Sequence, residues 1–111
     1  KKRIKIANFY KINIKNPKLN KLQYSKNCVF HQYVILCKKR ERLIKILKKK
    51  KIQYGLHYPY AIHELHSLKK IFKNQKFFNA ERLARQCISL PIDPNLSIID
   101  QKKIIKTLNS F

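Results

Sequence analysis

The feature that most constrains this chain is the apolar run from Cys28 to Cys37, Cys-Val-Phe-His-Gln-Tyr-Val-Ile-Leu-Cys. The run is rich in β-branched and aromatic residues and is apolar on both alternating faces, which is typical of a strand that is covered on both sides. His31 and Tyr33 share one face of such a strand. We therefore expect His31 to be a buried histidine with a satisfied ring rather than a catalytic group, and we expect a layered α/β fold.

Helical patterns surround this strand. Apolar residues recur at helical spacing in residues 1–14, 38–51, 65–72, 80–88 and 97–108. Asn79 is placed to cap the fourth of these helices, and Ser97 with Asp100 has the spacing of a capping box at the start of the last. Residues 52–54 predict a short strand. The order is therefore helix, strand, helix, short strand, loop and helices, with no internal repeat.

The loop after residue 54 carries the candidate binding residues. Gly55 is the single glycine of the chain, and we expect it to adopt an unusual backbone angle. His57, Tyr58 and His63 follow it and offer neutral donors and acceptors suited to sugar hydroxyls or a diphosphate. The alternative is that Tyr58 and its neighbouring proline pack the loop while one histidine binds a backbone carbonyl. The spacing of the two histidines does not match a helical metal pair, so we expect no metal site.

The formal charge of +22 is typical of nucleic-acid-binding domains. However, 22 of the 27 basic residues are lysine, and lysine, isoleucine and asparagine together dominate the composition, as an AT-biased coding sequence would produce. The aromatic residues cluster in the strand and the loop instead of alternating with the lysines, which disfavours a nucleic-acid groove. A small basic nucleic-acid-binding module is therefore the alternative function, and nucleic acid is not the partner we expect.

The remaining composition excludes several classes. The three cysteines are an odd number without CxxC spacing, which indicates neither a disulfide framework nor a zinc site. No segment approaches the roughly 20 consecutive apolar residues of a membrane-spanning helix, and the basic first residues are not followed by the apolar run of a signal peptide. We therefore expect a cytoplasmic protein without a membrane partner.

Several motifs resemble the DegT/StrS family of sugar-nucleotide aminotransferases. The segment Gly55-Leu-His-Tyr-Pro59, with His63 soon after, resembles the family's "GIHYP" segment and the histidine that follows it. The rest of the chain agrees in order and spacing. The similar segments are Arg3, Ala7 and Tyr10 ("RR..A..Y"), residues 30–35 ("hxYVI"), residues 42–52 ("R..L...L...GI") and residues 80–91 ("AE.L....LSLP").

The resemblance implies a fold and a function. The fold would be the small C-terminal α/β domain of a fold-type I aminotransferase, a short sheet packed with helices, with residues 1–15 as the helix that leaves a large domain and 16–111 as the small domain. The intact enzyme would use pyridoxal phosphate to pass an amino group, with glutamate as donor, to a keto-sugar nucleotide in aminodeoxy-sugar or cell-surface polysaccharide biosynthesis. It would act as a homodimer.

The same resemblance places the cofactor outside this chain. The family's Schiff-base lysine, the aspartate that pairs with the pyridine nitrogen and most phosphate contacts lie upstream of Lys1. No catalytic or cofactor-binding residue is therefore assigned here, and the chain alone is expected to bind no cofactor and to be inactive. Substrate contact is assigned to His57, Tyr58 and His63. A nonfunctional remnant is the third possibility.

Overall fold

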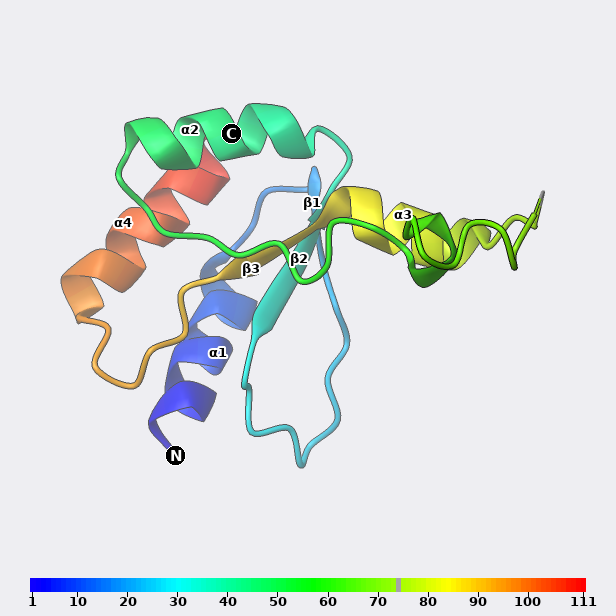
Figure 1. Ribbon diagram of the computed structural model, residues 1–111. Helices are drawn as coiled ribbons and strands as arrows, with labels where there is room; N and C mark the ends of the chain where they lie inside the picture. Colours follow the sequence, from blue (N-terminus) through cyan, green and yellow to red (C-terminus); the bar gives the residue numbers. More distant parts are fainter. Residues whose placement is uncertain (74) are drawn as a thin grey trace.

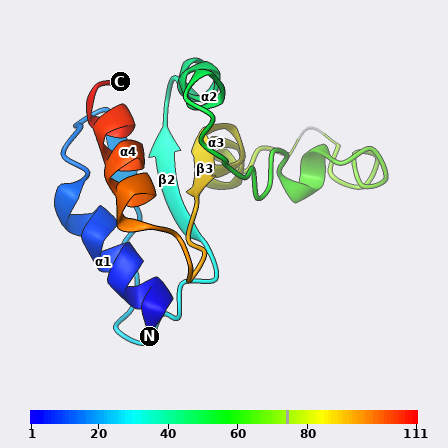
Figure 2. The ribbon, with the colours of Figure 1, turned by 90° about the vertical axis from the view of Figure 1, so that its left-hand side faces the viewer.

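A three-stranded antiparallel sheet in the order β1-β2-β3 organises the chain in the computed structural model, which describes residues 1–73 and 75–111 (Figure 1). The strands are β1 (Leu19–Lys21), β2 (Tyr33–Cys37) and β3 (Cys87–Leu90). The α-helices are α1 (Lys2–Asn13), α2 (Arg40–Lys49), α3 (Phe78–Gln86) and α4 (Ile98–Asn109). Viewed along the sheet, α1 and α4 lie together on one side, and α2 and α3 lie toward the other (Figure 2). The central strand β2 is therefore covered on both faces, as its composition predicts.

Apolar side chains from all these layers form one core. Ile35 of β2 and Ile88 of β3 are opposite each other in the sheet and are fully buried. The helices contribute further fully buried side chains, which include Tyr10, Leu43, Leu47 and Leu108. The hydroxyl of Tyr10 donates to the carbonyl oxygen of Pro91 over 2.9 Å, so α1 is tied to the segment after β3. Burial raises the pKa of this hydroxyl well above its ordinary value.

Three predicted helices agree with the structure. The helices expected over 1–14 and 38–51 are α1 and α2. At the last helix, Ser97 is the N-cap residue of α4, which begins at Ile98, since the backbone N–H of Asp100 donates to Ser97 Oγ over 3.0 Å. The Asp100 carboxylate accepts from Ser97 Oγ over 2.6 Å rather than from the Ser97 backbone N–H, so only half of the predicted capping box forms. Each of these segments has an apolar stripe that lies on the core. The helical spacing of its apolar residues therefore predicted the helix correctly.

The strand predicted over 28–37 is five residues shorter at its beginning. Phe30 has a φ of 54°, in the left-handed region, and the chain turns there before β2 starts at Tyr33. The ring of Phe30 packs against Tyr24 with centroids 5.0 Å apart. Val29 is 73% exposed, and His31 is also exposed. The prediction of a buried His31 was therefore wrong, because alternation along a strand says nothing about residues that precede it.

Strand β3 was missed, because its first residues continue the helical pattern of α3. The predicted helix over 80–88 ends at Gln86, and Cys87 already has extended angles. The guanidinium of Arg40 donates to the carbonyl oxygen of Ala84, a helix-end group that lacks a partner within the helix. The predicted cap is also wrong, since Phe77 and not Asn79 is the N-cap residue. Strand β1 was missed because only Leu19 of its three residues is buried.

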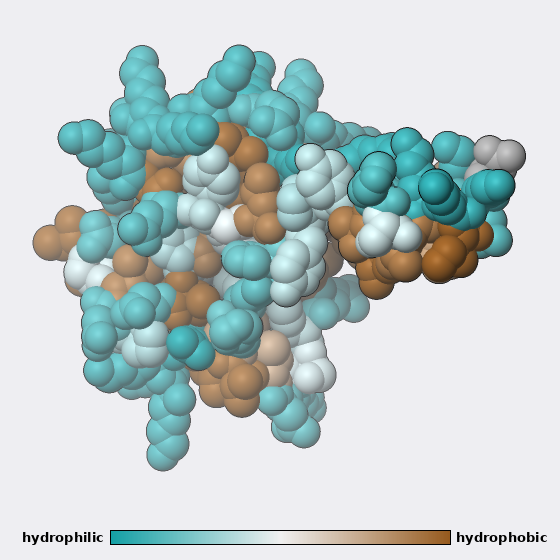
Figure 3. Space-filling view, viewed as in Figure 1, coloured by the Kyte–Doolittle hydropathy of each residue, from teal (hydrophilic) through white to brown (hydrophobic). Residues whose placement is uncertain are grey.

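Residues 58–73 and 75–86, called the arm below, project from the body of the molecule (Figures 1 and 2). The helix predicted over 65–72 is absent from it; the described residues there form turns, after a short 3₁₀ helix at Ile62–Glu64. Leu65 and Ile71 are 41% and 68% exposed, so the apolar stripe has no core beneath it. Apolar side chains gather instead on the lower surface of the arm (Figure 3).

Among the residues that the structure describes, no helix has both the length and the apolar character needed to span a membrane.

Candidate functional site

Gly55 and Ser89 hold the start of the candidate loop against the sheet. Their backbones form a two-bond antiparallel bridge, with Gly55 N to Ser89 O at 3.0 Å and Ser89 N to Gly55 O at 2.8 Å. The short strand predicted over 52–54 does not form, and the bridge at Gly55 lies just after it. The bridge aligns the loop with β3, so that the side chain of Ser89 can reach His57 two residues farther along.

His57 is fixed by a hydrogen bond between its Nδ1 and Ser89 Oγ, at 3.0 Å. The side chain is otherwise exposed, and among the described residues its Nε2 has no hydrogen-bond partner. The peptide bond between His57 and Tyr58 is cis. His57 thus has one ring nitrogen engaged in orienting the ring and one free to contact a ligand.

Gly55 is required for the close approach of the His57 ring. Its φ is not positive, so the expected unusual backbone angle is wrong. A Cβ at this position would instead overlap His57 Cε1 and lie 2.8 Å from His57 Nδ1. Glycine is therefore needed here because it has no Cβ to clash with the His57 ring, and not because the chain needs a special backbone angle.

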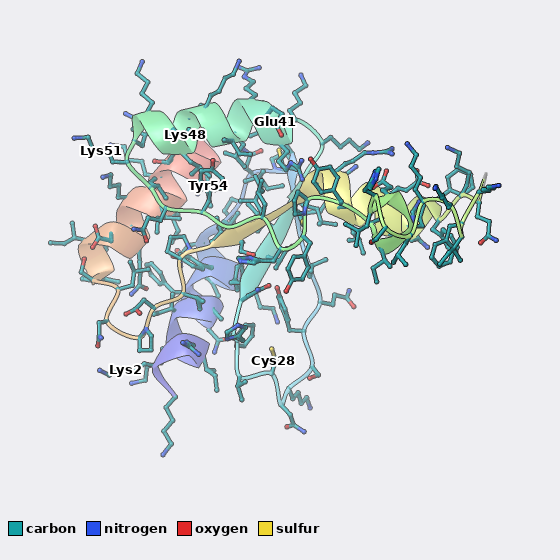
Figure 4. All side chains as sticks on the ribbon, viewed as in Figure 1. Lys2, Cys28, Glu41, Lys48, Lys51 and Tyr54 are labelled. Atoms are coloured by element: carbon teal, nitrogen blue, oxygen red, sulfur yellow. The ribbon has the colours of Figure 1, made fainter. Side chains whose placement is uncertain are left out.

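A surface hollow of about 250 Å³ lies beside His57. Tyr54, at its edge, lies on the segment that crosses in front of β3 after α2 (Figure 4). The hollow is lined by residues that carry neutral polar groups or none: His31, Gln32, Gln53, Tyr54, Gly55, His57, Ser89, Leu90, Pro91 and Ile92. Hydroxyl and carbonyl groups of a ligand match such a lining better than charged groups do.

Tyr58 and His63 do not line this hollow. Tyr58 is 75% exposed, and its carbonyl oxygen lies 3.8 Å from Cys87 Sγ. His63 lies in the arm, where its Nε2 is 3.2 Å from Glu81 Oε1 and its ring packs on Phe77 with centroids 4.8 Å apart. The structure therefore separates His63 from His57, although the sequence placed them in one loop.

The contacts of His63 belong to a network of charged groups. Glu81 accepts hydrogen bonds from the backbone N–H of Phe77, from His63 and from Arg85, and Arg85 also pairs with Glu64. The hydrogen bond from Phe77, opposed by burial and aided by His63, lowers the pKa of the Glu81 carboxyl. The side chains of His63 and Glu81 are about nine-tenths buried. These contacts favour a role for His63 in holding the arm.

The residues around His57 do not fit pyridoxal phosphate itself. The cofactor needs an amine-bearing lysine and a carboxylate near its ring nitrogen. The described residues that line the hollow include no lysine, aspartate or glutamate. Nor do three or more histidine, cysteine, aspartate or glutamate side chains gather into a possible metal site anywhere in the described part of the chain.

Comparison with known proteins decides the family. The model of the DegT/DnrJ/EryC1/StrS aminotransferase family matches residues 1–109. The chain belongs to this family. It is 29% identical over 112 aligned residues to the dTDP-3-amino-3,6-dideoxy-alpha-D-galactopyranose transaminase of Aneurinibacillus thermoaerophilus, covering 99% of this chain and 31% of that protein. The chain thus spans about a third of the relative's length.

Solved structures of aminotransferases confirm the fold class, a short sheet packed with helices. S. venezuelae DesV, solved with a ketimine intermediate, superposes with a TM-score of 0.89 at 23% identity, over 98% of this chain and 30% of that one. The Helicobacter pylori aminotransferase PseC, involved in the biosynthesis of pseudoaminic acid, gives a TM-score of 0.83 at 25% identity, over 99% of this chain and 33% of that one. This chain therefore corresponds to about a third of such an enzyme.

Two residues of the site were not predicted from the sequence. Ser89 belongs to the Ser-Leu-Pro motif, but its role as the partner of His57 depends on the bridge to Gly55, which no local pattern encodes. His31 was assigned to the core and instead lies on the same hollow as His57. The positive φ at Phe30 causes this, and phenylalanine gives no sequence signal for it.

Proposed function

We propose that this DegT/StrS domain is the sugar-facing third of an aminotransferase that passes an amino group, with glutamate as donor, to a keto-sugar nucleotide. The observation that carries the proposal is the placement of the His57 ring. Gly55 gives it room, Ser89 orients it, and its Nε2 has no hydrogen-bond partner among the described residues, beside a hollow lined with neutral polar and apolar groups. Such a group can donate to or accept from a sugar hydroxyl or carbonyl.

The cofactor chemistry is assigned to the remainder of the enzyme. Pyridoxal phosphate supplies the electron sink of a transamination when it is bound. This chain would contribute His57 to orient the sugar and the walls of the hollow to restrict the bound ring. By itself it is expected to form no one-to-one aldimine, and an absorbance titration with pyridoxal phosphate measures this directly.

The domain boundary that we propose comes from the family resemblance. Helix α1 carries core residues Ile6, Ala7 and Tyr10 and packs on α4. We propose that residues 1–15 connect a large, cofactor-binding domain to the small domain at 16–111. We further propose a cytoplasmic homodimer that serves aminodeoxy-sugar or polysaccharide biosynthesis, in line with the family.

The substrate role of His57 is tested in a hybrid enzyme. Residues 1–111 would replace the matching third of the Aneurinibacillus transaminase, to which 99% of the chain aligns. His57→Ala is expected to lower kcat/KM for the keto-sugar nucleotide by about tenfold or more, as loss of a hydrogen bond made to substrate would. The melting temperature should change little, because the ring is exposed.

His66→Ala is the matched control, since His66 is also an exposed histidine but lies in the arm, away from the hollow. Its turnover should equal that of the unsubstituted hybrid. Equal turnover for His57→Ala and His66→Ala would show that the His57 ring only packs the loop.

A further inference from the structure

We propose that His31 and Gln53 form a second wall of the sugar hollow, and that His31 positions the sugar ring together with His57. This inference rests on the proposed function and extends it to residues outside the motif that suggested it. Three separate segments meet at the hollow: residues 31–32 before β2, residues 53–57 after α2, and residues 89–92 at the end of β3. His31 and His57 thus reach one site from different parts of the chain.

The backbone at Phe30 gives an independent reason to assign a role to His31. A non-glycine residue in the left-handed region, here with φ at 54°, is unfavourable because its Cβ crowds the following carbonyl oxygen. Such residues concentrate at ligand sites, where the surrounding structure holds them in place. Here the Phe30 ring is held between Tyr24 and Tyr33, with centroids 5.0 and 6.2 Å away.

The consequence of this turn is the exposure of His31. If β2 continued straight back from Tyr33, His31 would share the face of Tyr33, which is 2% exposed and packed in the core. The turn instead leaves His31 exposed on the rim of the hollow. Packing of the Phe30 ring against its aromatic neighbours therefore maintains an unfavourable φ at Phe30. As a result, the imidazole of His31 lies at the candidate site.

The lining defines the kind of group that the hollow would bind. It offers two imidazoles, the carboxamides of Gln32 and Gln53 and the hydroxyl of Ser89, with no lysine or arginine to bind a diphosphate. At about 250 Å³ it lies below the roughly 300–1,000 Å³ range of sites for drug-sized ligands. It therefore suits the single ring of a hexose rather than a whole nucleotide sugar.

Two polar walls also provide a means of selecting the sugar. A site built to hydrogen-bond a hydroxyl rejects an analogue that lacks it when the bound ligand shields the polar groups of the site from water and leaves them unpaired. His31 and Gln53 would contact ring hydroxyls that His57 does not reach. They would then help to decide which hydroxyl configuration is accepted.

The test is an NMR titration of the full 111-residue chain with dTDP-glucose, and in parallel with dTDP. The signals to follow are the imidazole protons of His31 and His57 and the side-chain amide of Gln53. All three are expected to shift with dTDP-glucose and to remain in place with dTDP. His31→Ala should weaken binding of dTDP-glucose about tenfold, while His66→Ala should leave it unchanged and the backbone amide spectrum reports that both variants are folded.

The other outcomes separate the two proposals. Shifts at His57 without shifts at His31 and Gln53 would overturn the second wall and leave the role of His57 intact. Equal shifts with dTDP would show that the hollow binds the nucleotide or its phosphates, which contradicts the assignment to the sugar. No shift at any of the three would contradict both this inference and the substrate role of the loop.

Discussion

At the scale of single residues, Gly55 controls the orientation of His57. A Cβ at position 55 would collide with the imidazole, while the φ of Gly55 is accessible to any residue. Two effects of Gly55→Ala then oppose each other. Alanine reduces the conformational entropy of the unfolded chain, which stabilises by about 0.4–1 kcal/mol, and loss of the bond to Ser89 costs about as much.

We therefore expect Gly55→Ala to change the free energy of unfolding by less than about 1 kcal/mol while displacing the His57 ring. Chemical denaturation gives the first quantity, and the NMR signals of the imidazole give the second. Ser89→Ala serves as the comparison, since it removes the hydrogen bond without a steric overlap. An unchanged His57 environment in Gly55→Ala would show that the glycine has no such function.

Residues 55–59 show what sequence can and cannot predict about the site. His57 could be chosen as a candidate from the sequence, because a family motif contains it. The reason for the glycine could not, since it depends on where a ring two residues away lies. His31 could not be placed either, because its position depends on how Phe30 packs between Tyr24 and Tyr33.

At the scale of elements, the start of α3 depends on the carboxylate of Glu81. This carboxylate accepts the backbone N–H of Phe77 at 3.1 Å and also contacts His63 and Arg85. The pKa values of Glu81 and Glu64 are lowered, chiefly by hydrogen bonds from Phe77 and Ala61 respectively. A carboxyl whose pKa is lowered on folding stabilises the fold above its unfolded value, here 4.5, and this stabilisation is lost as the pH falls through the folded value.

The arm is therefore expected to lose protection from amide exchange as the pH is lowered from neutral to about 3, before the sheet does. Glu81→Gln should weaken the arm at neutral pH and reduce this pH dependence. Glu41→Gln is the control, because Glu41 is exposed on α2 and contacts only Arg40 among the described residues. If the protection of the arm from amide exchange had the same pH dependence in Glu81→Gln and in the unsubstituted chain, the stabilising role of Glu81 would be refuted.

The elements also show where sequence patterns fail. The helices α1, α2 and α4 could be predicted because each has an apolar face on the common core. The arm could not, because the stripe at residues 65–72 has the same period but no sheet beneath it. Cys87 and Ile88 continue the pattern of α3 and yet form β3, since pairing with β2 decides their conformation.

At the scale of the whole molecule, the charge of +22 is borne mainly by lysines. The ion pairs among the described residues all use arginine or histidine. Lys51, which follows α2, extends away from the body (Figure 4). The lysine side chains are spread over the surface rather than gathered with aromatic residues, which leaves charge as the sole basis for binding nucleic acid.

We accordingly expect weak binding to DNA or RNA that is independent of sequence and largely lost between about 50 and 200 mM salt. Fluorescence anisotropy with unrelated labelled oligonucleotides measures both properties. Sequence-selective binding that persists at the higher salt concentration would favour a nucleic-acid module over an aminotransferase domain.

The most direct measurement of the central claim is amino transfer by the hybrid enzyme. The Aneurinibacillus transaminase would be prepared with its matching third removed, and with that third replaced by residues 1–111. We predict that the truncated protein transfers no amino group from glutamate to a dTDP-linked keto-sugar, and that the hybrid carries out this transfer. A hybrid that folds and binds pyridoxal phosphate but leaves the keto-sugar unaminated would contradict the claim that this chain forms the sugar-facing part of such an enzyme.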